Sequence, residues 1–400
     1  MSSENPPTDG VGAFSAFSEM ERGKTMRITN IRAEVVHASV YSNYVFVIAE
    51  TDEGVLGFGD ATLDGLEFEV VAAVKNLGSR LVGKDVLDDD CSVPAGGGGL
   101  ITAAAASGID IAMWDLKGKA LNVPVYKLLG GAIRKTVPVY ASFNRAIRDR
   151  TPEGFGVFAG ELVAKGNRAL KCHPFDGVSW RTPLADQKRL VDLGCERFIA
   201  MREAVGDDIA IGVDAHWRFD MKTAMYVADK LRPYNPFWLE TPIPEKKPEL
   251  LRKFREECGL LVAGAEMQTG SEALLPLLRE QSLDVYMPDI RYVGGITGMM
   301  KVNALLEAYD VLISPHNMCS VITCAASLHT AAAMKNFMHL EYHPAEAPWL
   351  REFSDRYWDV ENGTFTVPEG PGLGVNLNLD MLKEHPYEKA KPLRLNMLGA

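Results

Sequence analysis

The sequence lacks the cysteine and glycine patterns of several common protein classes. Its six cysteines form no CxxC pair with the spacing of a zinc site, so we expect reduced, buried thiols in a cytoplasmic protein. The four consecutive glycines at 96–99 predict a flexible loop, because neither GxxxxGK[ST] nor GxGxxG follows a strand to form a phosphate cradle.

Basic residues and long apolar runs are also scarce. The chain has 42 Lys and Arg against 53 Asp and Glu, a formal net charge of −11, which disfavours nucleic acid and anionic membranes as partners. No stretch predicts a membrane span, since the Ala-rich segment near Ala103 is interrupted by Ser107, Gly108 and Asp110. A small anionic substrate is still compatible with this charge, because a bound divalent cation reverses its sign locally.

The length and composition fit a soluble enzyme with more than one domain: 400 residues, 47% hydrophobic and 24% charged. Residues 1–24 have no periodicity and no secretory pattern, so we expect a flexible N-terminal arm. Residues 25–136 combine β-rich runs with helical patterns, which predicts an α+β capping domain containing an antiparallel meander. Residues 353–400 show strands and turns, and we expect them to return to the capping domain.

Between residues 137 and 352, short apolar strands alternate with longer helical patterns. The eight strands are VPVYASF, ALKCHPF, IAIGVDAHW, FWLETPI, LVAGAEM, VYMPDI, VLISPHN and MHLEYH. This alternation predicts a parallel (β/α)₈ barrel of the TIM type. In that fold the active site lies at the carboxyl ends of the strands, so polar residues there are the candidates for chemistry.

Six polar residues at these strand ends recur at nearly one interval. The steps are 26, 26, 23, 27 and 25 residues, through Asp214, Glu240, Glu266, Asp289, His316 and Glu341. One βα unit has about that length, since a barrel has about 250 residues in eight units. We therefore expect the six side chains at one height on strands three to eight, converging on the barrel mouth.

Three of them, Asp214, Glu240 and Glu266, are carboxylates on adjacent strands. Unpaired in one pocket they would repel and raise each other's pKa, and a hard divalent cation would relieve this. Ligand sets made of oxygen alone favour Mg²⁺, or Mn²⁺ as a substitute. The alternative is that they are solvated acids or salt-bridge partners at the barrel rim.

Asp289 and His316 are expected on neighbouring strands. An Asp that binds one imidazole nitrogen fixes the tautomer and supports the cationic ring, which makes His316 a candidate general base. Glu341, if protonated, would donate a hydrogen bond to a developing enolate oxygen. The alternative is that Glu341 supports the groups that bind the substrate without contacting the substrate itself.

Strands two and three add further candidates. Lys171 would stabilise a bound carboxylate, or act as a base if a cation lowered its pKa. Alternation points His173 the same way as Lys171 and Cys172 the other way. His216 follows Asp214 by two residues, so it also points inward, where it would protonate a leaving hydroxyl or simply line the pocket.

These residues resemble the enolase superfamily, in its mandelate racemase subgroup, over nearly the whole chain. The motifs are GIDIAMWDLKGKALNVPVYKLLGG, WLETP, MPDIRYVGGITG, ISPHN and VPEGPGLGV. The resemblance implies a cap over the barrel mouth, Mg²⁺ on the three carboxylates, a His316–Asp289 base and a homo-oligomer. It also implies abstraction of the proton alpha to a carboxylate, through an enediolate.

The step after the enediolate differs among members of the superfamily. Asp214-Ala215-His216 is similar to the strand-three motif of acid-sugar dehydratases, where the His is the general acid, so we expect dehydration of a sugar acid to a 2-keto-3-deoxy sugar acid. The alternative is racemisation or epimerisation of a sugar acid or 2-hydroxy acid, with Lys171 and His316 as opposing bases. Lys171-Cys172-His173 departs from the Lys-x-Lys pair of racemases. A non-catalytic binding protein would not require the dyad.

Substrate specificity is expected to come from the capping domain. We predict that the segments 41–44 and 60–67 close over the site, because each follows one of the first strands. The loop at Trp180 and Arg181, after strand two, is a further candidate for contact with the distal end of a substrate.

Overall fold

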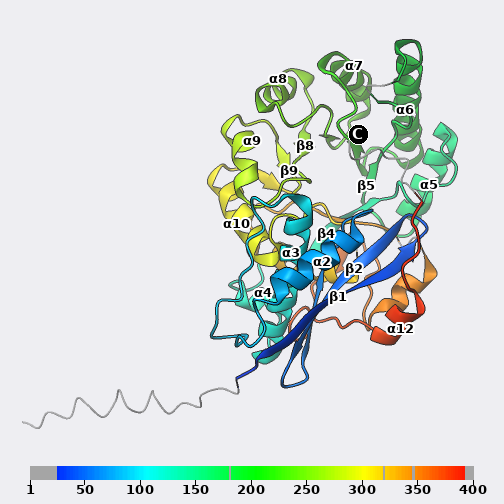
Figure 1. Cartoon of the computed structure of the whole chain (residues 1–400). Helices are drawn as coiled ribbons and strands as arrows, with labels where there is room; N and C mark the ends of the chain where they lie inside the picture. Colours follow the sequence, from blue (N-terminus) through cyan, green and yellow to red (C-terminus); the bar gives the residue numbers. More distant parts are fainter. Residues whose placement is uncertain (1–24, 180–181, 319, 345–346, 392–400) are drawn as a thin grey trace, which may run out of the picture.

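The structure is a computed structural model that describes residues 25–179, 182–318, 320–344 and 347–391. Figure 1 shows a small sheet with covering helices, coloured blue to cyan, beside a larger array of strands and helices that runs through green and yellow. The N-terminal arm and the loop at Trp180 and Arg181 lie outside the described residues.

The small sheet is the predicted antiparallel meander. It pairs β1 (Ile28–Ser39), β2 (Ser42–Thr51) and β3 (Leu56–Asp60) in the order β1-β2-β3. The helices α2 (Glu67–Gly78), α3 (Gly99–Ala120) and α4 (Val125–Leu128) follow it in the chain. Strand β2 reads YVFVIA without polar alternation because both of its faces are buried: Val45 and Val47 pack in one hydrophobic cluster, and Phe46 and Ile48 in another.

Helix α3 is the most apolar long helix among the described residues. Its length and hydropathy would allow it to cross a membrane, but 72% of its most apolar window is buried inside the protein. It packs against β3, β2 and α2, and the side chains of Ala104 and Ala105 are fully buried. The Ala-rich composition is therefore that of a core helix.

Glycines allow α3 to lie very close to the sheet. A Cβ added at Gly59 would be 1.9 Å from the carbonyl oxygen of Gly108, and one added at Gly57 would be 2.5 Å from that of Ala112. On the helix side, a Cβ at Gly108 would meet Val47 and Ala61 at 2.8 Å. The cap is thus assembled by backbone contact between β3 and α3.

The eight predicted barrel strands are all present. They are β4 (Thr136–Ser142), β5 (Ala169–Cys172), β6 (Ala210–Asp214), β7 (Leu239–Glu240), β8 (Val262–Gly264), β9 (Val285–Tyr286), β10 (Leu312–Ile313) and β11 (Leu340–Tyr342). Consecutive strands from β4 to β10 pair in parallel, and β11 pairs in parallel with β4. The ring closes where Ile313 bridges Phe337 and accepts a 2.8 Å hydrogen bond from the Met338 N–H.

Helices connect each strand to the next. They are α5 (Pro152–Ala164), α6 (Leu184–Val205), α7 (Met221–Leu231), α8 (Pro248–Cys258), α9 (Leu275–Arg279), α10 (Gly295–Ala308) and α11 (Val321–Ala333), with the 3₁₀ turns η1 (Arg232–Tyr234) and η2 (Glu272–Leu274). Local sequence sets their ends: Thr151 accepts from the Gly154 N–H and Pro152 follows it at the start of α5. Gly259, at φ +66°, ends α8.

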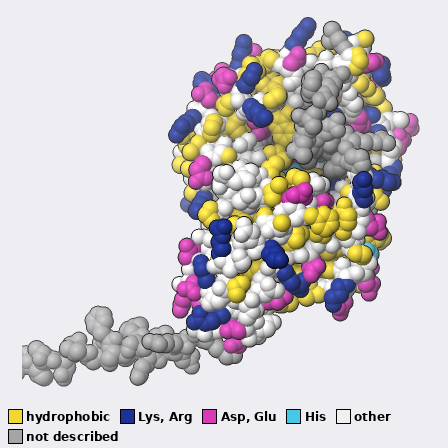
Figure 2. All heavy atoms as spheres, viewed as in Figure 1, with side chains coloured by type: hydrophobic (Ala, Val, Ile, Leu, Met, Phe, Trp, Pro, Cys, Tyr) yellow, Lys and Arg dark blue, Asp and Glu magenta, His cyan; other side chains and the backbone are white. Residues whose placement is uncertain are grey.

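After β11 the chain returns across the barrel to the cap. It forms η3 (Pro348–Phe353), then β12 (Thr364–Thr366), which pairs antiparallel with β4, and α12 (Leu379–Glu384). The Leu373 N–H donates to the buried carboxylate of Asp115 on α3 at 2.8 Å, and Pro386 bridges Val36 on β1. On the face in Figure 2, charges of both signs are interspersed with apolar side chains.

Replacing Gly59 with Ala should destabilise the protein, because the new methyl group has no room against the backbone of α3. We expect a loss of about 2 kcal/mol or more in the free energy of unfolding, as in other overpacked cores. The matched control is Gly160→Ala in α5, where a Cβ would meet nothing within 4 Å. That change should stabilise the helix by up to about 1 kcal/mol. Denaturant unfolding of both variants measures the difference, and equal behaviour would contradict the packing argument.

Candidate active site

The six residues of the predicted ring meet at the carboxyl ends of the strands. Asp214 and Glu240 are the last residues of β6 and β7 and are paired in register. Asp289 and His316 form a parallel bridge just beyond β9 and β10. Glu266 lies two residues beyond β8, and Glu341 is the middle residue of β11. All six side chains are buried.

The carboxylates of Asp214, Glu240 and Glu266 form one cluster, with an oxygen from each lying within 4.8 Å of the other two. Burial raises the pKa of Glu240 well above its usual value, and the charge of Asp214 adds to the effect. Burial likewise raises the pKa of Glu266 to about 7. Ionising Glu240 and Glu266 together is therefore unfavourable for the protein alone.

A divalent cation fits this cluster. The Oε1 atom of Glu266 is buried and accepts no hydrogen bond from the described part of the chain. Asp214 is held in place by its neighbours, since its Oδ1 accepts from the Thr241 hydroxyl at 2.7 Å and from the His216 backbone N–H at 2.8 Å. The donors of the cluster are all carboxylate oxygens, which suit a hard cation.

Lys171 on β5 places a positively charged side chain beside these carboxylates. Its Nζ lies 3.1 Å from Glu240 Oε1 and 2.9 Å from Glu341 Oε1, and the side chain is 1% exposed. Burial would lower the pKa of Lys171, but Glu240 and Glu341 outweigh burial and raise it well above its usual value. This differs from the lowered pKa that a role as base would need.

Glu341 is anchored as an anion. Burial alone would raise its pKa, but Lys171 and His316 outweigh burial and the pKa is lowered. Its Oε2 also accepts from the Tyr140 hydroxyl at 3.2 Å and from the Asn317 N–H at 3.4 Å. The protonated, hydrogen-bond-donating Glu341 considered from the sequence is therefore not what this arrangement favours, because a lysine and two further donors surround the charge.

His316 and Asp289 form the predicted dyad. The His316 Nδ1 lies 2.6 Å from Asp289 Oδ2, while its Nε2 faces Glu266 Oε2 at 3.5 Å. Burial would lower the pKa of His316, but Glu266, Glu341 and Asp289 raise it above its usual value. With Nδ1 bonded to Asp289, Nε2 is the nitrogen that faces the cluster and can take a proton.

Arg291 supports the dyad and was missed from the sequence. Its Nε donates to Asp289 Oδ1 at 3.0 Å, and its backbone N–H donates to the same oxygen at 2.8 Å. Burial would raise the pKa of Asp289, but Arg291 outweighs it and the pKa is lowered to about 2. The available signal was its position two residues after Asp289, which allows both side chains to point the same way.

His173 and His216 lie together beside Asp214. His216 Nε2 is 3.0 Å from Asp214 Oδ2, and His173 Nδ1 is 3.3 Å from the same oxygen. The two imidazole rings stack, with centroids 4.3 Å apart. Burial lowers the pKa of His216 to about 4 and that of His173 well below its usual value. Cys172 packs in the core on the other face of β5, as alternation predicts.

The cap segment 60–67 contacts residues that follow three of the barrel strands, β10, β9 and β4. Asp60 accepts from the Ser320 hydroxyl, and the Thr62 carbonyl accepts from Arg291 Nη1 at 3.0 Å. Asp64 pairs with Arg145 at 2.9 Å. In the segment 41–44, Tyr41 accepts from Arg148 at 3.4 Å and Asn43 donates to the Glu388 carbonyl at 3.0 Å.

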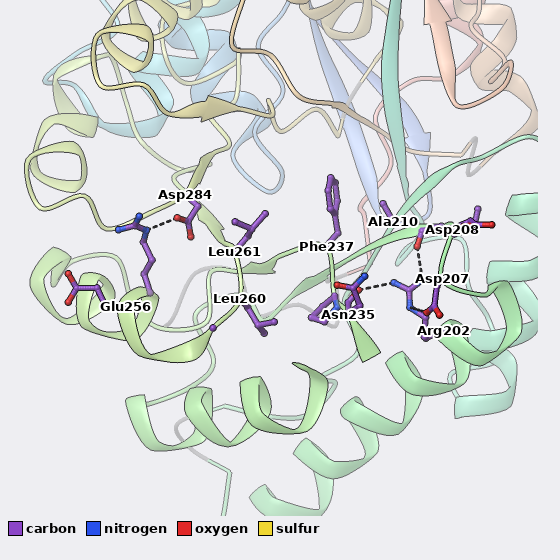
Figure 3. A pocket seen from close by; sticks show the side chains of 14 residues that line it. Arg202, Asp207, Asp208, Ala210, Asn235, Phe237, Glu256, Leu260, Leu261 and Asp284 are labelled. Carbon is purple, nitrogen blue, oxygen red and sulfur yellow. Dashed lines mark hydrogen bonds and ion pairs between the residues drawn. The ribbon is translucent and has the colours of Figure 1, made fainter. Parts of the chain in front are cut away.

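A large pocket lies away from these residues, near the start of β6 and just ahead of β7, β8 and β9 (Figure 3). It has a volume of about 700 Å³. Both of its arginines have structural partners: Arg255 pairs with Asp284 at 2.7 Å, and Arg202 donates to the carbonyls of Ile209 and Asn235. These contacts fix the turns at the amino-terminal end of the barrel, where this fold does not carry its chemistry.

Comparison with known proteins agrees with this architecture. Residues 155–381 match the family model described as enolase C-terminal domain-like. Residues 25–130 match that of the mandelate racemase / muconate lactonizing enzyme N-terminal domain.

Relatives with known names and structures extend the match. A D-gluconate dehydratase from Thermoproteus tenax is 32% identical over 360 residues, covering 88% of this chain and 71% of the relative. A D-galactonate dehydratase from Pectobacterium atrosepticum is 32% identical over 355 residues, covering 85% and 90%. The crystal structure of an enolase superfamily member from Salmonella Typhimurium superposes with a TM-score of 0.81 at 28% identity, covering 90% of this chain and 98% of that one. The chain therefore belongs to the enolase superfamily, in its mandelate racemase and muconate lactonizing enzyme family.

Proposed function

We propose that this protein is a carbon–oxygen lyase that dehydrates a sugar acid to a 2-keto-3-deoxy sugar acid. The observation that carries the proposal is the carboxylate cluster with a histidine on each flank: His316 contacts Glu266, and His216 contacts Asp214. Loss of water from C2–C3 needs one group to remove a proton and another to protonate the leaving hydroxyl. The names of the two relatives make gluconate and galactonate the first substrates to test.

Asp214, Glu240 and Glu266 are the proposed metal ligands. A divalent cation bound there would supply positive charge beside the substrate carboxylate, and the oxygen ligands favour Mg²⁺ with Mn²⁺ as a substitute. Lys171 adds a fixed positive charge to the same pocket, where it stabilises negative charge that develops on the substrate's oxygens.

In the proposed reaction His316 Nε2 takes the proton from C2. Asp289 holds the ring by its Nδ1, and Arg291 keeps Asp289 ionised, so the proton stays on the imidazole. The C3–O bond then breaks and the C2=C3 bond forms. The departing hydroxide takes a proton from the protonated form of His216, which burial opposes and the contact with Asp214 favours, and leaves as water. Protonation of the resulting enol at C3 yields the 2-keto acid.

Epimerisation with Lys171 and His316 as opposing bases has less support. Lys171 lies within ion-pair distance of both Glu240 and Glu341, and their charges favour its protonated form. A base must first lose that proton, which this surrounding opposes. The ion pairs support Lys171 as a charge-stabilising group instead.

The direct test is incubation with aldonic and aldaric acids in the presence of Mg²⁺, followed by an assay for 2-keto acid. We expect keto acid from at least one aldonic acid. Calorimetry should show in parallel that the metal is bound. If the metal binds and no acid of the panel is dehydrated, the proposal fails, and deuterium uptake at C2 without loss of water would select epimerisation.

Replacing His316 with Asn should remove the base while leaving the metal cluster intact. We expect both keto acid formation and exchange of the C2 proton with D₂O to fall by about 10²–10⁴-fold, the usual contribution of a positioned acid or base. Calorimetric Mg²⁺ binding should stay within a few-fold of the wild type. Turnover that survives the substitution would exclude the dyad from the mechanism.

Replacing Glu266 with Gln should have opposite effects with and without metal. It removes one of three crowded carboxylates, so the metal-free variant should melt at a higher temperature than the metal-free wild type. Burial raises the pKa of Glu266 in the folded protein from 4.5 to about 7, so this carboxyl costs stability increasingly as pH rises between those values. The difference in Tm between variant and wild type should grow over the same range.

With metal, the same variant should lose about tenfold or more in Mg²⁺ affinity by calorimetry, since it lacks one anionic ligand. Glu256→Gln, at the other end of the barrel, is the control and should change neither quantity. Unchanged Mg²⁺ affinity in the Glu266 variant would remove that residue from the ligand set.

A further inference from the structure

His173 is a buried histidine of the site to which the proposed reaction gives no role. It directly follows β5, is 3% exposed, and has protein groups at both ring nitrogens. Its Nε2 is 3.3 Å from the Ser142 hydroxyl on β4. Its Nδ1 is 3.1 Å from each ring nitrogen of His216 and 3.3 Å from Asp214 Oδ2. Both nitrogens are thus within contact distance of protein groups.

The backbone around His216 is shaped to bring its ring onto His173. His216 and Trp217 have φ of 46° and 54°, in the left-handed region that side chains with a Cβ rarely adopt. The turn is fixed by the bond from the His216 N–H to Asp214 and by a 2.6 Å bond from the Trp217 N–H to the Thr241 carbonyl. A strained conformation held in this way at a site is a reason to look for a function.

Asp214 would be shared between the His216 ring and the proposed metal. Its Oδ2 is the oxygen nearest to both imidazoles, yet Asp214 is also a proposed metal ligand. A cation bound by Asp214 competes for that charge. The His216 ring also contacts Trp217, with centroids 6.1 Å apart, but its closest ring neighbour is His173, stacked at an interplanar angle of 22° and contacting Ser142 in turn.

We propose that His173 is a positioning residue that acts through His216. Ser142 ends β4, His173 directly follows β5 and His216 lies two residues beyond β6. The three side chains form one row on neighbouring strands, in which each group limits the rotation of the next. The row holds the His216 ring where it can protonate the leaving 3-hydroxyl. This inference rests on the proposed dehydration, and it concerns the second half of that reaction only.

The test uses two readouts in D₂O at saturating Mg²⁺: exchange of the substrate's C2 proton, which needs His316, and formation of keto acid, which also needs His216. His173→Phe keeps a stacked ring and removes both nitrogens. We expect kcat for dehydration to fall about 10–100-fold, as for groups that orient a ligand or catalytic residue, with KM nearly unchanged and C2 exchange retained. His173→Gln, which keeps a polar group, should recover part of the loss.

A double-mutant cycle decides whether His173 acts through His216. If it does, His173→Phe combined with His216→Asn should be no slower than His216→Asn alone. Ser142→Ala is a milder second probe that keeps the fold if the Phe variant is unstable. It should slow dehydration by a smaller factor, and only while His216 is present. His385→Asn, at the end of α12 in the C-terminal segment, is the control for a general effect of losing a histidine.

Two results would overturn the inference. Losses that multiply in the double variant would mean that His173 acts independently of His216. A parallel fall of exchange and dehydration in folded His173 and Ser142 variants would mean a structural role. Failure of the wild-type protein to dehydrate any sugar acid would refute the proposed function instead, and it would be seen before any variant is made.

Discussion

The repulsion among buried carboxylates at the barrel mouth is the constraint that organises this protein. Asp214, Glu240, Glu266, Asp289 and Glu341 all lie in one low-exposure region. Lys171 is bonded to Glu240 and Glu341, and Arg291 to Asp289. Glu266 and Asp214 have no such side-chain ammonium or guanidinium partner among the described residues, and burial raises the pKa of Glu266. Crowded acids of this kind are a local cost that real proteins accept at functional sites and offset elsewhere in the fold.

Spacing along the chain was enough to predict the barrel and the ring of polar residues. The interval of about 25 residues between successive ring residues, from Asp214 to Glu341, reflects one strand and one helix of a closed parallel sheet. Seven of the eight strands lie within the predicted segments, and β4 begins one residue earlier, at Thr136. Such a period is a property of local structure, so it is visible without coordinates. It also places Asp289 beside His316, because both follow neighbouring strands by the same number of residues.

The ionisation state of individual groups could not be predicted from the spacing. Glu341 was considered as a neutral donor, but its charge depends on Lys171, which is 170 positions away in sequence and two strands away in the ring. Arg291 was overlooked because its second contact, the carbonyl of Thr62, belongs to the cap. The burial of both faces of β2 likewise depends on the elements that pack against it. The sequence alone did not predict it, because a continuous apolar run fits a buried strand or a buried helix equally well.

The two family models meet between residues 130 and 155, but one hydrophobic cluster contains side chains from both sides of that boundary. Phe46, Ile48 and Phe58 of the small sheet belong to the same cluster as Val139 and Phe143 of the barrel. A barrel expressed without its cap would expose that apolar face to water and invite aggregation. A chimera with a relative's cap would likewise have to match the shapes of the side chains where cap and barrel pack together, as well as the loop lengths. Exchange of whole domains is therefore a costly way for such a protein to acquire a new substrate, whereas changes within a loop such as 60–67 leave the packing between cap and barrel intact.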